Sequence, residues 1–195
     1  DNSKTIGTLN VWQQLLVSFF QTVTMRTAGF ATISYTNANF TSNLLFMIQM
    51  FIGGGTGGTA GGIKVTTASI MFLLFKSVLS GNSRVVFRNR IISNKTVMQA
   101  FTVILFYLIM LLVGYVILLQ TNPTLSPLAL LFESVSAIAT VGVSMDLTSS
   151  LNTMGRLVIM ALMFIGRVGP ITVLLSLMTK KEKHVSYAPT HISVG

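Results

Sequence analysis

The chain of 195 residues is 51% hydrophobic and only 9% charged, whereas a soluble domain carries about 25% charged residues. This composition favours a membrane protein, and the absence of cysteine excludes disulfides and thiolate metal sites. The formal net charge of +9 would suit a nucleic-acid partner. Because the basic residues gather in two polar segments that flank apolar spans, as in cytoplasmic loops, we expect a lipid membrane and no nucleic acid.

The first apolar stretch, residues 11–26, is shorter than the roughly 20 residues that a bilayer-spanning helix needs. We therefore predict a re-entrant pore helix that ends at the turn TAGFA (27–31). Non-helical backbone at membrane depth is tolerated only against protein or water. A polar, turn-rich stretch at 33–43 then predicts an aqueous loop.

A broken helix is predicted over residues 44–79. Its apolar start is interrupted by the ten residues 53–62, of which seven are glycine. Each glycine costs a helix about 1 kcal/mol relative to alanine, so we predict an unwound, mobile loop midway across the membrane. The basic segment 80–96 that follows is predicted to be a cytoplasmic loop.

The second half of the chain repeats this order with one more helix in front. Residues 97–119 carry no charge over 23 positions, which predicts a transmembrane helix. A second pore helix is predicted at 127–139, and it leads to the turn TVGVS (140–144). The last predicted span, 151–178, is interrupted by GRVGP (166–170) and precedes a polar cytoplasmic tail.

The two halves match at a fixed offset. TAGFA returns as TVGVS 113 positions later, and MFIG at 50–53 returns at 163–166. Such self-similarity defines a repeated structural unit. We therefore predict an all-α membrane protein made of repeated helix–pore helix–filter–helix units related to potassium channels. Residues 1–96 would form a pore unit that lacks its first helix, and residues 97–195 would form a complete one.

The turn after each pore helix is a candidate cation filter. A helix C-terminus aims the negative end of its dipole at the turn, and glycine permits the positive φ that lets successive carbonyls face one way. Rings of carbonyls select monovalent cations, although a common helix C-cap with glycine has the same sequence pattern. The residues predicted to bind K+ are Thr27, Ala28, Gly29, Phe30, Thr140, Val141, Gly142 and Val143.

The glycine-rich run contains G-x-G-x-x-G, but no strand precedes it, so we set aside a dinucleotide site. A phosphate loop is also set aside, because no Gly-Lys-Ser/Thr sequence follows. Close packing of helices through small residues is the structural alternative, but in a pore the run would obstruct the path just inside the filter. The residues of the predicted gate are Gly53, Gly54, Gly55, Thr56, Gly57, Gly58, Thr59, Ala60, Gly61, Gly62, Lys64 and Arg167.

Arg167 lies at the middle of the last span, where an arginine costs about 2.5–3.5 kcal/mol and needs a water-filled cavity or a partner. It could be a fixed positive charge at the gate or a structural donor to carbonyls of the neighbouring broken helix. Lys64 could snorkel or bind carbonyls. Glu133 could pair with Arg26 or with backbone donors, and Asp146 could attract cations or be a solvated loop acid. With no histidine–acid cluster in the sequence, we predict no catalytic site and no enzyme.

The sequence resembles the Trk/Ktr/HKT superfamily of potassium transporters, and most of all the KtrB-type membrane subunits of bacteria. The resemblance covers nearly the whole chain and rests on TAGF at 27–30, FIGGGTGGTAGGIKVTT at 51–67, TVGVS at 140–144 and FIGRVGP at 164–170. In that family, four helix–pore–helix units of one polypeptide surround a central path. This chain would supply the third unit, without its first helix, and the complete fourth. The run GGGTGG departs from the family, whose loops often carry Ser and Pro.

The resemblance implies that 27–31 and 140–144 form two quarters of the filter, that 53–62 is the intramembrane gating loop and that Arg167 faces this loop. It implies a multi-pass subunit of the bacterial plasma membrane that conducts K+ ions, with Na+ as a further candidate ion. The implied partners are the missing N-terminal half with two further pore units, a second copy in a homodimer, and a cytoplasmic ring of nucleotide-binding regulatory subunits. The alternatives are a tetrameric cation channel of the two-helix-plus-pore type and a non-transporting membrane scaffold.

Overall fold

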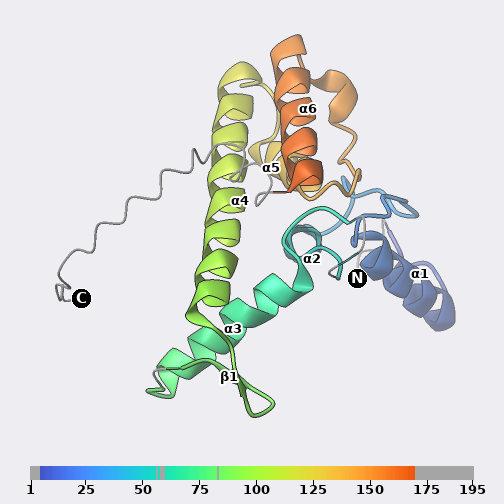
Figure 1. The fold of residues 1–195 in the computed structure, drawn as a ribbon. Coiled ribbons are helices and arrows are strands. Elements are labelled where there is room, and N and C mark those ends of the chain that lie inside the picture. Colours follow the sequence, from blue (N-terminus) through green and yellow to red (C-terminus); the bar gives the residue numbers. More distant parts are fainter. Residues whose placement is uncertain (1–4, 56, 58–59, 83, 170–195) are drawn as a thin grey trace.

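The computed structural model describes residues 5–55, 57, 60–82 and 84–169. Figure 1 shows helices joined by short loops, with one small hairpin between the third and fourth helix. In chain order the elements are α1 (Val11–Thr24), α2 (Phe40–Phe51), α3 (Val65–Leu79), β1 (Val86–Phe87), β2 (Arg90–Ile91), α4 (Asn94–Thr121), α5 (Pro127–Ile138), the 3₁₀ helix η1 (Thr148–Ser150) and α6 (Thr153–Val168).

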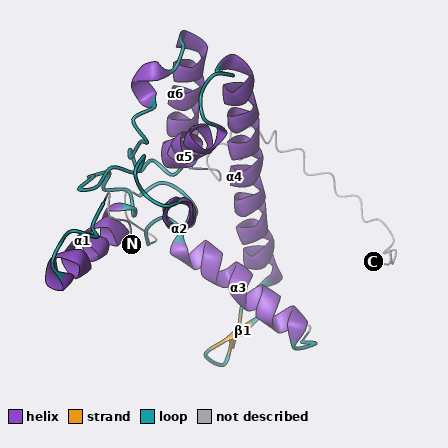
Figure 2. Ribbon diagram, turned by 180° about the vertical axis from the view of Figure 1, so that it is seen from behind, coloured by secondary structure: helices purple, strands orange, loops and turns teal. Residues whose placement is uncertain are grey.

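The C-terminal half is built around α5. Nine of the twelve residues of this helix are buried, and α4 and α6 stand beside it (Figures 1 and 2). A glycine on α4 brings the long helices together, because a Cβ added to Gly114 would lie only 2.8 Å from Cδ1 of Leu162 on α6. Within the described part of the chain, α4 alone is long and apolar enough to cross a bilayer unaided, and α2, α3 and α5 are shorter apolar helices.

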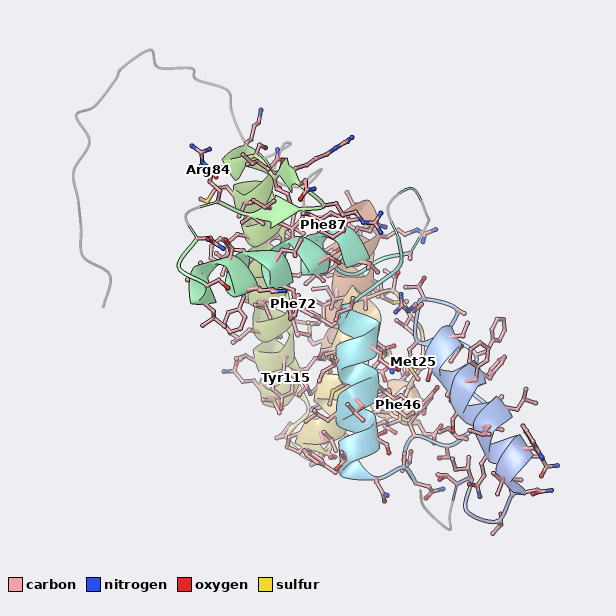
Figure 3. The ribbon with its side chains drawn as sticks, turned by 90° about the horizontal axis from the view of Figure 1, so that it is seen from below. Met25, Phe46, Phe72, Arg84, Phe87 and Tyr115 are labelled. Atoms are coloured by element: carbon pink, nitrogen blue, oxygen red, sulfur yellow. The ribbon has the colours of Figure 1, made fainter. Side chains whose placement is uncertain are left out.

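An apolar cluster joins the two halves of the chain. Met47 and Met50 of α2 pack with Phe132 of α5 and with Met25 and Tyr35, which flank the first predicted filter. The ring of Tyr35 lies 5.3 Å from that of Phe132, between centroids. In Figure 3, Met25 lies between α1 and α2. The residues that flank the first predicted filter are therefore packed against α5.

Helix α1 lies apart from the other helices in both ribbon views (Figures 1 and 2). Its start is well defined, because Asn10 and Gln13 form a reciprocal capping box. Its apolar side chains are nevertheless exposed, Trp12 to 80% and Phe19 to 69%. Surface of this kind fits contact with lipid or with further protein.

Several boundaries differ from the sequence-based expectations. Helix α2 begins at Phe40, inside the stretch expected to be a loop. The segment 80–96, also expected to be a loop, contains the antiparallel hairpin of β1 and β2, with two residues in each strand. The two-residue turn of this hairpin has positive φ at Arg88 (46°) and Asn89 (62°), which matches the twist of paired strands. Helix α6 ends at Val168, with Gly169 as its C-cap, and residues 170–178 of the expected span lie outside the described residues.

Candidate functional site

The two predicted filter turns have the same backbone pattern. The threonine and the glycine of each turn have positive φ, with values of 67° at Thr27, 79° at Gly29, 55° at Thr140 and 90° at Gly142. Glycine adopts this conformation readily, but a β-branched residue rarely does. Both turns therefore alternate between ordinary and left-handed backbone directly after the C-terminus of a short helix.

A hydroxyl residue near the end of each short helix holds the turn that follows. In the first turn, the amides of Ala28 and Gly29 donate to the Thr24 carbonyl at 3.0 and 3.3 Å, and the Phe30 amide donates to Thr24 Oγ1 at 2.8 Å. In the second turn, the Val141 amide donates to the Ser136 carbonyl at 2.9 Å. The Gly142 amide donates to Ser136 Oγ at 3.2 Å, so Thr24 and Ser136 are supporting residues that the sequence analysis missed.

The two turns lie against each other, although 113 positions separate them in the chain. A Cβ added to Gly29 would overlap the carbonyl oxygen of Val141, whereas a Cβ added to Gly142 would meet no described atom within 4 Å. Val141 and Val143 are buried, and Phe30 is 68% exposed. The carboxyl ends of α1 and α5 thus converge at one point.

Polar side chains behind each turn connect the short helix to the loop after the turn. In the first half, the Gln21 amide nitrogen donates to the Tyr35 hydroxyl at 2.8 Å, and the Thr32 hydroxyl donates to Gln21 Oε1 at 3.2 Å. Burial raises the pKa of the Tyr35 phenol above 10.0, opposed in part by the Gln21 hydrogen bond. The phenol therefore stays neutral at physiological pH.

In the second half, Glu133 of α5 connects the short helix to the loop after the turn, as Gln21 does in the first half. It does not pair with Arg26, as the sequence analysis considered, because Arg26 is exposed while only 6% of Glu133 is exposed. The Thr148 hydroxyl donates to Glu133 Oε1 instead. Asp146 accepts a hydrogen bond from the Thr36 hydroxyl at 3.1 Å, so the loops that follow the two turns are also in contact.

The glycine-rich run begins at the end of α2, and its last residues lie beside its first ones there. The Gly53 amide donates to the Ile63 carbonyl at 2.8 Å, and the Ile63 amide donates to the Phe51 carbonyl at 3.1 Å, so the base of the loop is closed by a short parallel bridge. Helix α3 then runs in a different direction from α2 (Figures 1 and 3). Thr56, Gly58 and Thr59 of the predicted gate lie outside the described residues.

The returning end of this loop contacts the second turn. The Gly61 amide donates to Thr140 Oγ1 at 3.1 Å, and a Cβ on Gly61 would lie 2.9 Å from the Ala139 carbonyl oxygen. From the other side, a Cβ on Gly166 of α6 would lie 3.1 Å from Thr140 Cγ2. Small residues at these two positions let the loop and α6 reach the base of the second turn.

A cavity of about 260 Å³ lies next to this contact. Lys64 and Arg167, the two cationic residues of the predicted gate, both line it together with Gly61. Lys64 Nζ donates to the Ala60 carbonyl at 2.5 Å and so binds the loop. Tyr107 of α4 also lines the cavity, and its hydroxyl donates to the Gly166 carbonyl at 3.4 Å. Tyr107 could not be predicted from the sequence, because nothing in the uncharged stretch 97–119 distinguishes it from Tyr115.

The described residues offer no group of three or more His, Asp or Glu side chains that could hold a metal ion. The polar groups that converge at the two turns are instead backbone amides, carbonyls and hydroxyls.

Comparison with known proteins identifies the family. Residues 1–187 match the model of the TrkH family, described as cation transport protein. The chain is 37% identical, over 94% of its length, to the potassium/sodium uptake protein NtpJ of Enterococcus hirae, and 33% identical, over all of its length, to the Ktr system potassium uptake protein B of Bacillus subtilis. It spans 42% and 43% of these two relatives, which are transport proteins and not enzymes.

A solved structure has the same fold. The potassium transporter TrkH from Vibrio parahaemolyticus aligns with a TM-score of 0.74 at 20% identity, over 89% of this chain and 39% of that chain. The resemblance to the Trk/Ktr/HKT superfamily is thereby confirmed, and the chain spans about two fifths of the length of the relatives that it matches. The chain belongs to the TrkH family of cation transport proteins.

Proposed function

We propose that this chain is the C-terminal half of a membrane subunit of a bacterial potassium uptake system. In this proposal K+ passes through a carbonyl-lined filter, to which residues 27–31 and 140–144 contribute two quarters. The loop 53–62 gates the path beneath them. The observation that carries the proposal is the shared backbone pattern of the two turns, which repeats at Thr27 and Thr140 and at Gly29 and Gly142.

Electrostatics supports a cation path at the two turns. The C-termini of α1 and α5 carry the negative ends of their helix dipoles, and these ends converge where Gly29 meets Val141. Left-handed residues at alternate positions turn successive carbonyls toward one side, where they can replace the hydration shell of a monovalent ion. No acidic side chain has to take part in such a site.

Three contacts support the gate. The loop is closed at its base by the Gly53–Ile63 bond, its returning end is bound to Thr140, and Arg167 and Lys64 share the cavity next to it. An unwound loop exposes carbonyls that lipid cannot satisfy, and guanidinium offers five donors for them. In this proposal Arg167 stabilises the closed loop and adds a fixed positive charge to the barrier for cations.

Two quarters cannot close a ring, so the proposal includes an N-terminal half with two further pore units. It also includes a multi-pass location in the plasma membrane, a homodimer and a cytoplasmic ring of nucleotide-binding regulatory subunits. Na+ is a second candidate ion, and the relative from Enterococcus hirae is named a potassium/sodium uptake protein. The names of the matched relatives favour uptake over the alternative of a tetrameric channel.

Flux of Rb+ and K+ into proteoliposomes that contain the intact transporter tests this function. We expect Gly29→Ser and Gly142→Ser to reduce flux or selectivity, because serine strains the left-handed backbone at both turns. Gly81→Ser is the matched control, since Gly81 also has positive φ (67°) and would meet no described atom within 4 Å, but it lies at the end of α3. An intact protein that moves neither ion, or two turn variants that behave like the Gly81 variant, would overturn the proposal.

A further inference from the structure

One carboxyl oxygen behind the second turn is buried without a partner. Glu133 lies on α5 with 6% of its surface exposed. Its Oε1 accepts from the Thr148 hydroxyl of η1, beyond the turn. Its Oε2 has no hydrogen-bond partner among the described residues. A buried polar atom in this state is costly, because it has lost its bonds to water.

A small cavity is lined by Glu133, with polar residues on one part of its wall and apolar residues such as Ile159 and Met163 on the other. Its volume is about 120 Å³, and Glu133, Ser136, Ser144 and Thr148 line it together with Gly142 of the turn. A water molecule takes about 30 Å³ in the liquid and needs two to four polar partners. The cavity offers both the room and the partners, because its lining includes a carboxyl and three hydroxyl groups.

The hydroxyls of this lining already hold the turn. Ser136 Oγ accepts from the Gly142 amide at 3.2 Å, and Ser144 Oγ accepts from the Leu147 amide at 3.2 Å. Thr148 Oγ1 lies 3.1 Å from Ser144 Oγ. Any water bound to Glu133 Oε2 in this cavity is therefore next to the groups that set the shape of the second turn.

The first turn is braced in the same way but without an acid. Both polar atoms of the Gln21 amide have partners, Tyr35 and Thr32. The repeat places Phe20, which is 40% exposed, at the position that corresponds to Glu133. The unpartnered carboxyl oxygen thus occurs behind the second turn and has no counterpart behind the first.

We propose that the cavity behind the second turn binds ordered water and that Glu133, through this water and through Thr148, is a positioning residue for the turn. The inference rests on the proposed function, because it gives Glu133 a part in ion selection. Glu133 contacts no ion itself. It fixes the angle of the carbonyls in 140–144, and their angle decides how well they replace the hydration shell of K+.

The first test compares selectivity at equal folded yield. In proteoliposomes of the intact transporter, Glu133→Leu should lower the K+/Na+ flux ratio about fivefold, the size expected for one lost hydrogen bond. Glu133→Gln should lower it less, because an amide still accepts from Thr148 and still binds water. Ser134→Ala is the control, since Ser134 is fully buried on the same helix and its hydroxyl donates to the Leu130 carbonyl.

An unchanged ratio in Glu133→Leu, at normal folded yield, would overturn the positioning role while leaving the proposed function intact. Absence of flux in the unaltered protein would instead refute the proposed function. A high-resolution structure of the unaltered transporter shows directly, without any variant, whether water occupies the cavity. We expect ordered water within hydrogen-bond distance of Glu133 Oε2, and an empty cavity in a map that resolves other buried waters would overturn the inference.

Discussion

Replacing Thr140 with valine tests the contact between the loop and the second turn. Valine keeps the β-branched shape, so the backbone strain at φ 55° stays the same, and only the hydroxyl is lost. The buried Gly61 amide, which donates to this hydroxyl at 3.1 Å, is then left without its acceptor. An unsatisfied buried amide costs about 1–3 kcal/mol. A change of 1–2 kcal/mol shifts an equilibrium between a closed and an open loop by about five- to thirtyfold.

We therefore expect Thr140→Val to raise basal Rb+ flux of the intact transporter, measured in proteoliposomes without regulatory subunits. Thr27→Val is the matched control. It makes the same change at the corresponding position of the first turn, where φ is 67°, and within the described residues the Thr27 hydroxyl makes no bond to the loop. Equal basal flux in the two variants would show that the Gly61–Thr140 hydrogen bond does not hold the loop closed.

Three further changes test other parts of the account. Arg167→Ala should raise basal flux at unchanged folded yield, and a lower yield with unchanged flux per folded molecule would leave the residue only a structural role. Gly114→Ala should lower thermal stability by about 1–3 kcal/mol through overpacking against Leu162, and the added change Leu162→Val should recover part of the loss; no recovery would contradict this contact. Tyr35→Phe removes the acceptor of the buried Gln21 amide and should lower the melting temperature by the equivalent of about 1–3 kcal/mol. An unchanged melting temperature would show that this hydrogen bond is not needed.

The sequence predicted the two turns well because their signal is local and repeated. Glycine at Gly29 and Gly142 indicated positive φ, and the structure has it at both. The positive φ of Thr27 and Thr140 could not be predicted, since threonine disfavours it. The role of these residues in ion binding stays a prediction.

Features that depend on tertiary packing were missed. The contact of Gly29 with Val141 follows from how α1 and α5 are oriented, and neither helix encodes that by itself. The opposite charges of Glu133 and Arg26 suggested a pair, but burial separates them, and an uncharged hydroxyl such as that of Thr148 gives no sequence signal.

Element boundaries failed where polar residues have buried partners. The polar start of α2 resembles a loop, yet Asn43 is buried there and donates to the Tyr35 carbonyl at 3.0 Å. The hairpin of β1 and β2 was missed because its turn, Arg88-Asn89, lacks the glycine that usually marks such a turn. In both places the residue types are typical of a loop, but hydrogen bonds to nearby backbone groups stabilise a helix or a hairpin instead.

We propose that monovalent cations bind at the carbonyls of the two turns. A structure of the intact transporter soaked in Rb+, with the ions located by anomalous scattering, tests this binding. We expect ordered Rb+ beside the carbonyls of 27–31 and 140–144, and weaker occupancy in Gly29→Ser and Gly142→Ser. A well-resolved map with no ion at either turn, in a protein that still transports Rb+, would show that the two turns are not the cation site.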